Sequence, residues 1–212
     1  MILHSPLGVP PNPLSGPRSI GDATDYVRFD PAAAAYTFAG AGRPNKRLAV
    51  SGPAVAAYVV GIATATRLAT NANSNADFPA VQVTASNDGG WRSLMAVVDE
   101  ACDVADSASV IVPVQAVAAA SGNVSLRVDW DRTRDATNGI AEGSASNVVA
   151  GPTSTGDIRF ALAGTIPAGT FAVGDVIGVS IQRLGSSDAG DTYTQDLLIA
   201  RFAWILFKRC RL

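Results

Sequence analysis

Carboxylates are the residues in this chain whose spacing comes nearest to a reactive or metal-binding pattern. The run DWDRTRD, from Asp129 to Asp135, carries three of them. Calcium takes oxygen ligands of this kind, but an EF-hand loop needs an acid or amide and then a glycine where this chain has Thr133 and Arg134. We therefore expect the exposed end of a strand here, and no metal site.

Two further acidic features invite a functional interpretation. Asp99 and Glu100 form the densest acidic doublet. Glycoside hydrolysis needs a pair of carboxyl groups, but this doublet lies in a weakly apolar segment that we expect to face solvent. Asp188 and Asp191 lie in the turn SDAGDTY. We expect them to accept hydrogen bonds from loop amides, because a calcium site would need a denser set of oxygen ligands.

The sequence lacks the motifs that usually support nucleophilic catalysis or cofactor binding. The single histidine, His4, lies among prolines near the N-terminus, which excludes a triad or a histidine-based metal site elsewhere in one chain. The patterns GxSxG, HExxH and the P-loop are absent, and GAGRPN at 40–45 lacks the third glycine of a dinucleotide loop. We expect no enzyme and no cofactor.

Aromatic and sulfur-containing residues are few. Tyr26, Tyr36, Trp91 and Trp130 could stack on sugar rings, but only 7% of residues are aromatic, and Trp130 is in register with apolar positions. We therefore favour core or interface positions for these rings. The two cysteines, Cys102 and Cys210, form no CxxC pair. Buried thiols are favoured over a disulfide, since free cysteine is among the most buried residue types.

The composition indicates that much of the protein's surface contacts other protein molecules. Charged residues make up 16% of the chain, against about 25% in typical soluble proteins; a bias towards alanine, glycine and threonine is the alternative explanation. The net charge of −2 offers no basic patch for nucleic acid. The uncharged stretch from Leu48 to Thr66 contains Pro53 and many small residues, so we expect β structure there and no membrane span.

The sequence divides into three parts. Residues 1–20 hold five prolines and read as an extended arm rather than a secretion signal. We expect this arm to dock on the capsid or another virion protein, a disordered terminus being the alternative; its apolar residues are Ile2, Leu3, Leu7, Val9 and Leu14. Residues 21–75 form an N-terminal β-rich segment that ends in the polar run TNANSNAD. Residues 76–212 form the main domain.

Short alternating runs separated by glycine-rich turns dominate the main domain. NVSLRVDW, DIRFAL and DVIGVSIQR each place apolar residues at every second position. Such punctuation is typical of antiparallel β-sandwiches. The segment from Ser93 to Asp106 is the best candidate for a short helix or a single turn.

The C-terminal strand is apolar on both parities. Leu197, Ile199, Ala203, Ile205 and Phe207 occupy one parity. Phe202, Trp204 and Leu206 are on the other. A strand with one face in water alternates apolar and polar residues. We therefore predict that one side faces the core and that the side of Trp204 forms an inter-subunit interface.

A set of motifs in this region resembles a known family. SGNVSLRVDW is followed by a T-x-P-A-G approach, an I-x-R strand end and the SDAGDTY turn before the last strand. Together they resemble a jelly-roll domain common in tailed-phage structural proteins. The resemblance covers roughly residues 80–207 and is strongest from Ser154 onward; the turn has AGD where AAD is commoner, and residues 1–75 have no counterpart. It implies head decoration proteins, head fibres or tail appendages, often homotrimers.

The sequence thus predicts an all-β protein, an antiparallel jelly-roll β-sandwich with an extended N-terminal arm and extra N-terminal strands. The expected function is a trimeric capsid decoration, or cement, protein, made in the host cytoplasm and placed on the virion head, with the tail as the alternative. One alternative function is a glycan-binding receptor module of a head spike or tail appendage. The other is a polysaccharide-degrading tail module.

Overall fold

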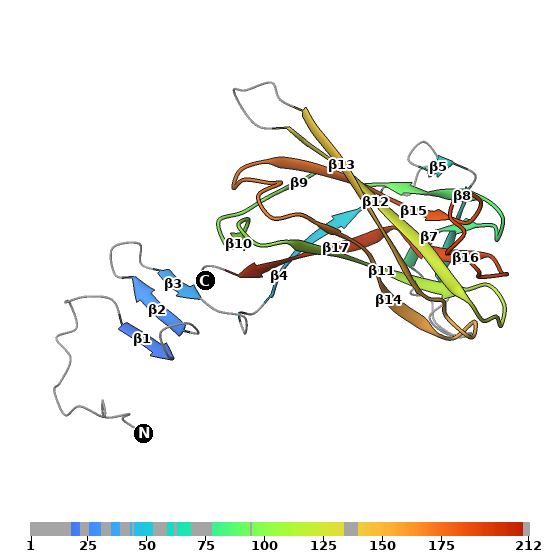
Figure 1. Cartoon of the computed structure of the whole chain (residues 1–212), viewed down its shortest axis with the longest axis horizontal. Coiled ribbons are helices and arrows are strands. Elements are labelled where there is room, and N and C mark those ends of the chain that lie inside the picture. Colours follow the sequence, from blue (N-terminus) through green and yellow to red (C-terminus); the bar gives the residue numbers. More distant parts are fainter. Residues whose placement is uncertain are drawn as a thin grey trace.

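The computed structural model describes residues 18–21, 26–30, 35–38, 43, 45–52, 59–61, 63–68, 78–93, 95–133 and 140–209. Every regular element in these ranges is a strand, and every pairing between strands is antiparallel (Figure 1). The prediction of an all-β antiparallel sandwich is confirmed. The apolar residues of the arm, His4, Cys210 and the TNANSNAD run lie outside the described residues.

One sheet of the sandwich contains the C-terminal strand, and we call it the β17 sheet. Its order is β10-β17-β11-β16-β7-β6, with β14 paired to β11 and β4 paired to β17. The strands are β4 (Asn45–Ser51), β6 (Ala63–Leu68), β7 (Phe78–Val83), β10 (Cys102–Asp103), β11 (Ala108–Ala116), β14 (Ile158–Ile166), β16 (Leu197–Ala200) and β17 (Phe202–Arg209).

The second sheet, the β12 sheet, packs against the first. Its order is β13-β12-β15-β8-β5, with β9 paired to β15. The strands are β5 (Val59–Gly61), β8 (Asp88–Arg92), β9 (Ala96–Val97), β12 (Asn123–Thr133), β13 (Ile140–Ala150) and β15 (Val176–Leu184). A separate three-stranded sheet precedes the sandwich and consists of β1 (Arg18–Gly21), β2 (Tyr26–Asp30) and β3 (Ala35–Phe38).

The core lies between the two large sheets, where alternate residues of each strand meet. On β12, Val124, Leu126 and Val128 are fully buried, as the alternation predicted. Trp91 and Trp130 are also core residues, 0% and 6% exposed, so the core interpretation holds for both rings and neither offers a face to a sugar.

Strands from the N-terminal β-rich segment complete both sheets. β4 pairs with β17, β5 with β8 and β6 with β7. The described parts of the uncharged stretch from Leu48 to Thr66 therefore contain strands. Within the described ranges, no helix is long and apolar enough to cross a membrane.

The segment from Ser93 to Asp106 contains turns and the short strands β9 and β10 instead of a helix. Asp99 shapes one turn: its carboxylate accepts a hydrogen bond from the Ala101 amide at 2.9 Å, and its carbonyl accepts one from the Cys102 amide at 3.1 Å. The Cys102 side chain is buried, and burial, together with the charge of Asp99, raises the pKa of its thiol to about 12. Cys102 is thus the buried thiol that was expected.

Candidate functional site

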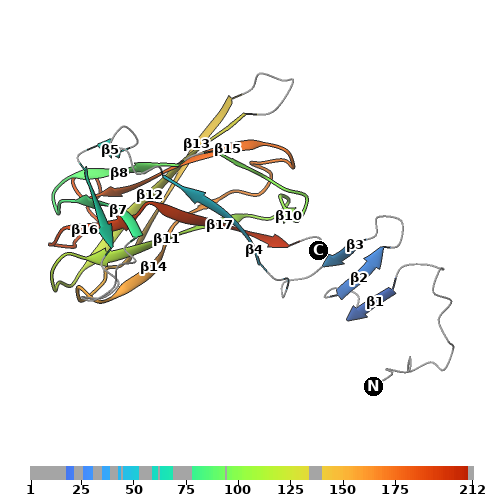
Figure 2. The same ribbon diagram turned by 180° about the vertical axis from the view of Figure 1, so that it is seen from behind.

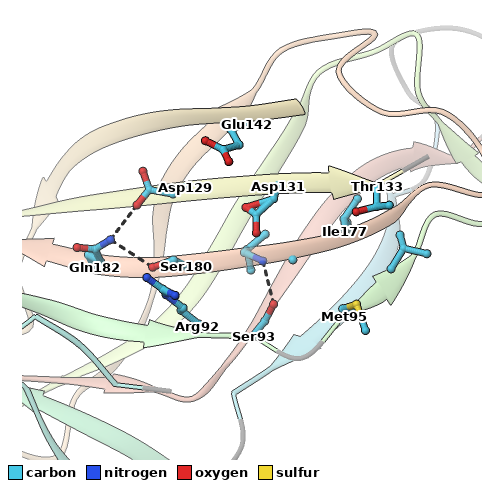
Figure 3. Close-up of a pocket in the computed structure, with 13 residues that line it drawn as sticks. Arg92, Ser93, Met95, Asp129, Asp131, Thr133, Glu142, Ile177, Ser180 and Gln182 are labelled. Carbon is cyan, nitrogen blue, oxygen red and sulfur yellow. Dashed lines mark hydrogen bonds between the residues drawn. The ribbon is translucent and has the colours of Figure 1, made fainter. Parts of the chain in front are cut away.

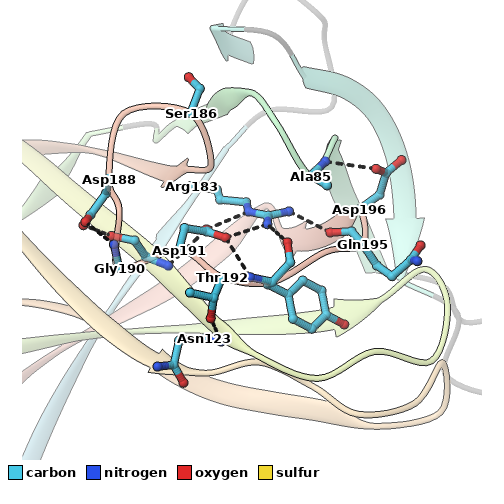
Figure 4. Close-up of polar contacts among 12 residues, drawn as sticks. Ala85, Asn123, Arg183, Ser186, Asp188, Gly190, Asp191, Thr192, Gln195 and Asp196 are labelled. Atoms are coloured by element: carbon cyan, nitrogen blue, oxygen red, sulfur yellow. Dashed lines mark hydrogen bonds and ion pairs between the residues drawn. The ribbon is translucent and has the colours of Figure 1, made fainter.

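The motif residues at the end of β15 and in the following turn form one buried ion pair (Figure 4). The Arg183 guanidinium donates two hydrogen bonds to the Asp191 carboxylate, at 2.9 and 2.7 Å, and both side chains are 0% exposed. Arg183 also donates to the carbonyls of Tyr193 and Gln195, at 2.6 and 2.8 Å. The I-x-R strand end and the SDAGDTY turn are therefore two halves of one structural unit.

The other polar residues of the turn also bond to the backbone or to a neighbouring strand. Asp188 accepts from the Gly190 amide at 2.8 Å and from the Ser125 hydroxyl, and the Ser125 hydrogen bond holds the pKa of Asp188 below its usual value. Asp191 accepts from the Ser125 amide at 3.1 Å and the Tyr193 amide at 3.2 Å. The prediction that Asp188 and Asp191 cap amides is confirmed.

Asp129 and Asp131, the carboxylates of DWDRTRD that fall within the described residues, lie on the outer face of the β12 sheet, in a groove of about 470 Å³ (Figure 3). Asp129 is engaged: it accepts from Arg127 at 2.6 Å and from Gln182 at 2.8 Å. Asp131 and Glu142 are exposed and lie opposite each other in the β12–β13 register. Among the described residues, no group of three or more potential ligands could hold a metal ion.

Asp131 and Glu142 are unusual because like charges opposite each other on paired strands repel. Neither carboxylate has a hydrogen bond or ion pair within the described part of the chain. The groove floor includes Gly178 and Ser180, and none of its lining residues is aromatic. Such a surface can accept hydrogen bonds from hydroxyl groups, but it offers no ring for stacking.

The outer face of the β17 sheet has the opposite chemistry, and we call it the aromatic face. Its residues lie on β7, β11, β14 and β17, and none is charged: Phe78, Ile111, Pro113, Ile158, Phe160, Leu162, Phe202, Trp204 and Leu206. The register joins them, because Ile111 lies opposite both Leu162 and Trp204. The nearest cation, Arg47, sits at the edge with its guanidinium 5.6 Å from the Trp204 ring centre.

The rings of the aromatic face touch in a continuous series. Phe160 stacks on Trp204 with ring centres 5.3 Å apart, Phe202 meets Trp204 edge-on at 5.7 Å, and Phe78 contacts Phe202 at 5.5 Å. Phe160 is 59% exposed and Phe78 is 46% exposed. Together with Pro113 and Ile158, these rings line an apolar groove of about 390 Å³.

The C-terminal strand has one parity in the core and the other on the aromatic face. Ala203, Ile205 and Phe207 are at most 1% exposed. The predicted interface residues, Phe202, Trp204 and Leu206, are half-buried on the outer side. Their role between subunits stays a prediction.

Residues of β14 alternate between two faces as predicted, but the larger apolar residues of the DIRFAL run lie on the outer face and not in the core. Ile158, Phe160 and Leu162 point outward, while Ala161 and Ala163 face the core. Space explains the inversion: a Cβ at Gly164 would lie 2.7 Å from a Val128 methyl, so this strand runs too close to β12 for large inward side chains. The alanines at 161 and 163 were the available signal, and Phe78 and Phe160 were missed without it.

No family model matches the chain, and no curated protein matches it. Solved structures with a similar fold include the CBM22-1 xylan-binding domain of Paenibacillus barcinonensis Xyn10C, at 13% identity and a TM-score of 0.41, covering 79% of this chain and 99% of that one. Another is TmCBM61 in complex with β-1,4-galactotriose, at 13% identity and a TM-score of 0.31, covering 75% of this chain and 86% of that one.

Proposed function

We propose that this chain is a non-catalytic structural protein of a tailed-phage virion that assembles with copies of itself through the aromatic face. The observation that carries the proposal is the ring-lined outer surface of the β17 sheet, on which the only charge near the rings is Arg47 at the edge of the described strands. Of the virion locations, the head surface is preferred, with the protein acting as a decoration subunit. This preference depends on the proline-rich apolar arm that the sequence predicts for residues 1–20.

The aromatic face has the composition of a buried protein interface. An antiparallel sheet with one solvated side carries polar residues there, whereas the centre of a protein interface is rich in aromatic residues and poor in charge. Phe160 and Phe78 remain largely exposed in the single chain. A second subunit would remove their exposed parts from water, which stabilises the contact by roughly half of the about 1.5–3 kcal/mol that full burial of a large side chain contributes, before association costs.

The virion context is supported by the motifs that carry the resemblance. In the structure, the I-x-R strand end and the SDAGDTY turn act as one unit through Arg183 and Asp191. These residues are buried and serve the architecture of the sandwich. The structural role of this pair explains why the two motifs occur together in this chain, and the virion context itself depends on the sequence resemblance.

Replacing Trp204 with glutamate tests the proposal. The wild-type chain is expected to show a multiple of its 21.7 kDa mass in light scattering, and Trp204→Glu is expected to dissociate it while keeping a β-rich circular dichroism spectrum. Val173→Glu is the matched control, since Val173 is 51% exposed and lies outside the aromatic face. A wild-type chain that is monomeric at all concentrations, or a Trp204→Glu variant of native mass, contradicts the proposal.

Location on the particle is tested separately. Antibody labelling of intact virions is expected to mark three-fold clusters on the head. Labelling confined to the tail tip would contradict a decoration role and would favour the receptor-binding alternative.

A second candidate function, glycan binding, is favoured by the unpaired carboxylates Asp131 and Glu142 in the groove of the β12 sheet. Sugar hydroxyls are donors that would satisfy both groups. A glycan array with wild type and an Asp131→Asn/Glu142→Gln variant tests this function. Asp157→Asn is the control because Asp157 pairs with Arg159 outside the groove. Equal binding by wild type and the double variant would contradict this site.

A further inference from the structure

The apolar groove of the aromatic face offers ring surfaces and one polar group. Its rings come from the strands β7, β14 and β17: Phe78, Phe160, Phe202 and Trp204. No charged side chain lines it. The only side-chain hydrogen-bond donor among the lining residues is the indole N–H of Trp204, and within the described ranges no hydrogen bond engages it. The groove therefore suits an apolar ligand that also brings a hydrogen-bond acceptor.

A polyproline II segment has this complementary chemistry. Its proline rings are apolar and stiff, and the helix has no internal hydrogen bonds, so its carbonyl oxygens remain available as acceptors. Proline-rich segments bind in aromatic-lined grooves for this reason. An added β-strand fits less well, because the groove lies on the face of a sheet, where the backbone groups of β11 are already paired with β14 and β17.

The chain itself contains such a segment at residues 10–15, PPNPLS. Proline fixes φ near the polyproline II value, and a residue that precedes proline is restricted to extended conformations. The four residues from Pro10 to Pro13 all meet at least one of these conditions. Residues 1–17 precede the described ranges, and their sequence contains no Asp, Glu, Lys or Arg, which matches a groove without charged lining.

The three-residue repeat of polyproline II gives this segment two apolar edges and one polar edge. Residues three apart share an edge and lie about 9 Å apart along the helix. The edges are, in order, Pro10 with Pro13, Pro11 with Leu14, and Asn12 with Ser15. Two adjacent apolar edges can pack against the rings while the polar edge faces water.

The reach of the segment favours the groove of a neighbouring copy. The five residue steps from Pro13 to Arg18, where β1 begins, span about 16 Å in polyproline II. The five steps of β17 from Arg209 back to Trp204 alone span about 17 Å. β1 lies still further out, beyond the end of the sandwich at which Arg209 pairs with β10 (Figures 1 and 2).

We infer that residues 10–15 of one copy occupy the aromatic groove of a second copy of this chain. The inference rests on the proposed self-association and names the segment that forms the contact. The apolar edges pack against the rings, and the Trp204 indole N–H donates to a carbonyl of the segment. Each copy gives one segment and receives one, a head-to-tail contact that can close into a ring such as a trimer. Residues 1–9 remain available for the docking on the capsid that the sequence predicts.

Adjacent residues of the segment give a matched pair of variants. Pro13→Glu puts a charge on an apolar edge, while Asn12→Glu puts the same charge on the polar edge. In light scattering of the full chain, Pro13→Glu is expected to lower the mass to that of one chain, and Asn12→Glu is expected to keep the wild-type mass. Neither residue lies in a described strand, so both variants are expected to keep a β-rich circular dichroism spectrum.

A peptide tests the contact directly. A fluorescein-labelled peptide of residues 1–17 is titrated with the full-length Pro13→Glu chain, and binding is followed by fluorescence anisotropy. Adding Phe160→Ala, which removes an exposed ring without adding a charge, is expected to weaken binding at least tenfold. Val173→Ala is the matched control, since Val173 is exposed outside the aromatic face. A peptide with alanine in place of Pro10, Pro11 and Pro13 is expected to bind at least tenfold more weakly.

The outcomes separate the two proposals. If Trp204→Glu dissociates the assembly while Pro13→Glu keeps the wild-type mass, another element covers the groove; this inference then fails and the proposed function stands. Dissociation by Asn12→Glu, or peptide binding that Phe160→Ala leaves unchanged, also overturns the inference. If the wild-type chain is monomeric, both proposals fail.

Discussion

At the scale of single residues, the buried Arg183–Asp191 ion pair has a structural role: it joins the I-x-R strand end to the SDAGDTY turn. Both side chains are fully buried, and Arg183 also bonds two backbone carbonyls of the following loop. A buried charge without its partner is strongly destabilising. These residues therefore hold the turn between β15 and β16 in place rather than acting on a ligand.

Asp191→Leu is expected to lower the free energy of unfolding by about 3–5 kcal/mol, because it leaves the Arg183 guanidinium buried without a counter-charge. The double variant Arg183→Met/Asp191→Leu should recover only part of this loss, since the carbonyls of Tyr193 and Gln195 lose their donor. Urea denaturation measures both values.

The control is Arg127→Met, which breaks the exposed Arg127–Asp129 pair and is expected to cost less than about 1 kcal/mol. A similar loss in Arg127→Met and Asp191→Leu would contradict the assignment of the buried pair as the main anchor.

The stability of the fold is expected to decrease at low pH because of Asp188. The hydrogen bonds from Ser125 and the Gly190 amide lower its pKa in the folded chain below the usual 3.8. A carboxylate of this kind stabilises the fold fully above its unfolded pKa, and the contribution is lost as the pH falls through the folded value. The urea midpoint is therefore expected to fall below pH 4 more steeply in wild type than in Asp188→Asn, and equal slopes would contradict the role of this carboxylate.

At the scale of elements, close strand packing decides which residues fit. β8 and β15 pair directly, with Gly90 opposite Gln182. A Cβ at Gly90 would lie 1.8 Å from the Ile181 carbonyl oxygen, which is backbone and cannot rotate away. Crowding between the two sheets, where a Cβ at Gly164 would meet the Val128 side chain, turns the large side chains of β14 outward, and these form a third of the aromatic face.

Gly90→Ala is expected to destabilise the sandwich by at least about 1–3 kcal/mol, because the two central strands must separate to admit the methyl group. Gly156→Ala is the control: its Cβ would meet nothing within 4 Å, so we expect a change within about 0.5 kcal/mol. Thermal unfolding followed by circular dichroism distinguishes the two, and comparable melting temperatures would show that the strands adjust freely.

At the scale of the whole molecule, the two large sheets differ in what they present outward. The groove on the β12 sheet carries Asp129, Asp131 and Glu142 beside the exposed Met95, whereas the groove on the β17 sheet is lined by rings and aliphatic side chains alone. One side of the sandwich thus suits water or polar ligands, and the other suits protein. We therefore propose that the subunit contact lies on the side of the C-terminal strand.

Self-association predicts that stability depends on protein concentration. Because assembly stabilises only the folded chain, the melting temperature of wild type is expected to rise over a hundredfold increase in concentration. Trp204→Glu is expected to melt at the same temperature throughout that range. A wild-type melting temperature that is independent of concentration would argue against assembly through the aromatic face.

The sequence by itself determined that the chain is β-structured, that β12, β14, β15 and β17 have two distinct faces, and that Asp188 and Asp191 cap a turn. These properties are local: they follow from a two-residue period and from short-range side-chain chemistry. Only the tertiary structure decided which face of β14 meets the core, that Asp131 faces Glu142, and that Arg183 is buried against Asp191. Alternation divides a strand into two faces, but the position of the second sheet decides which of them is inside.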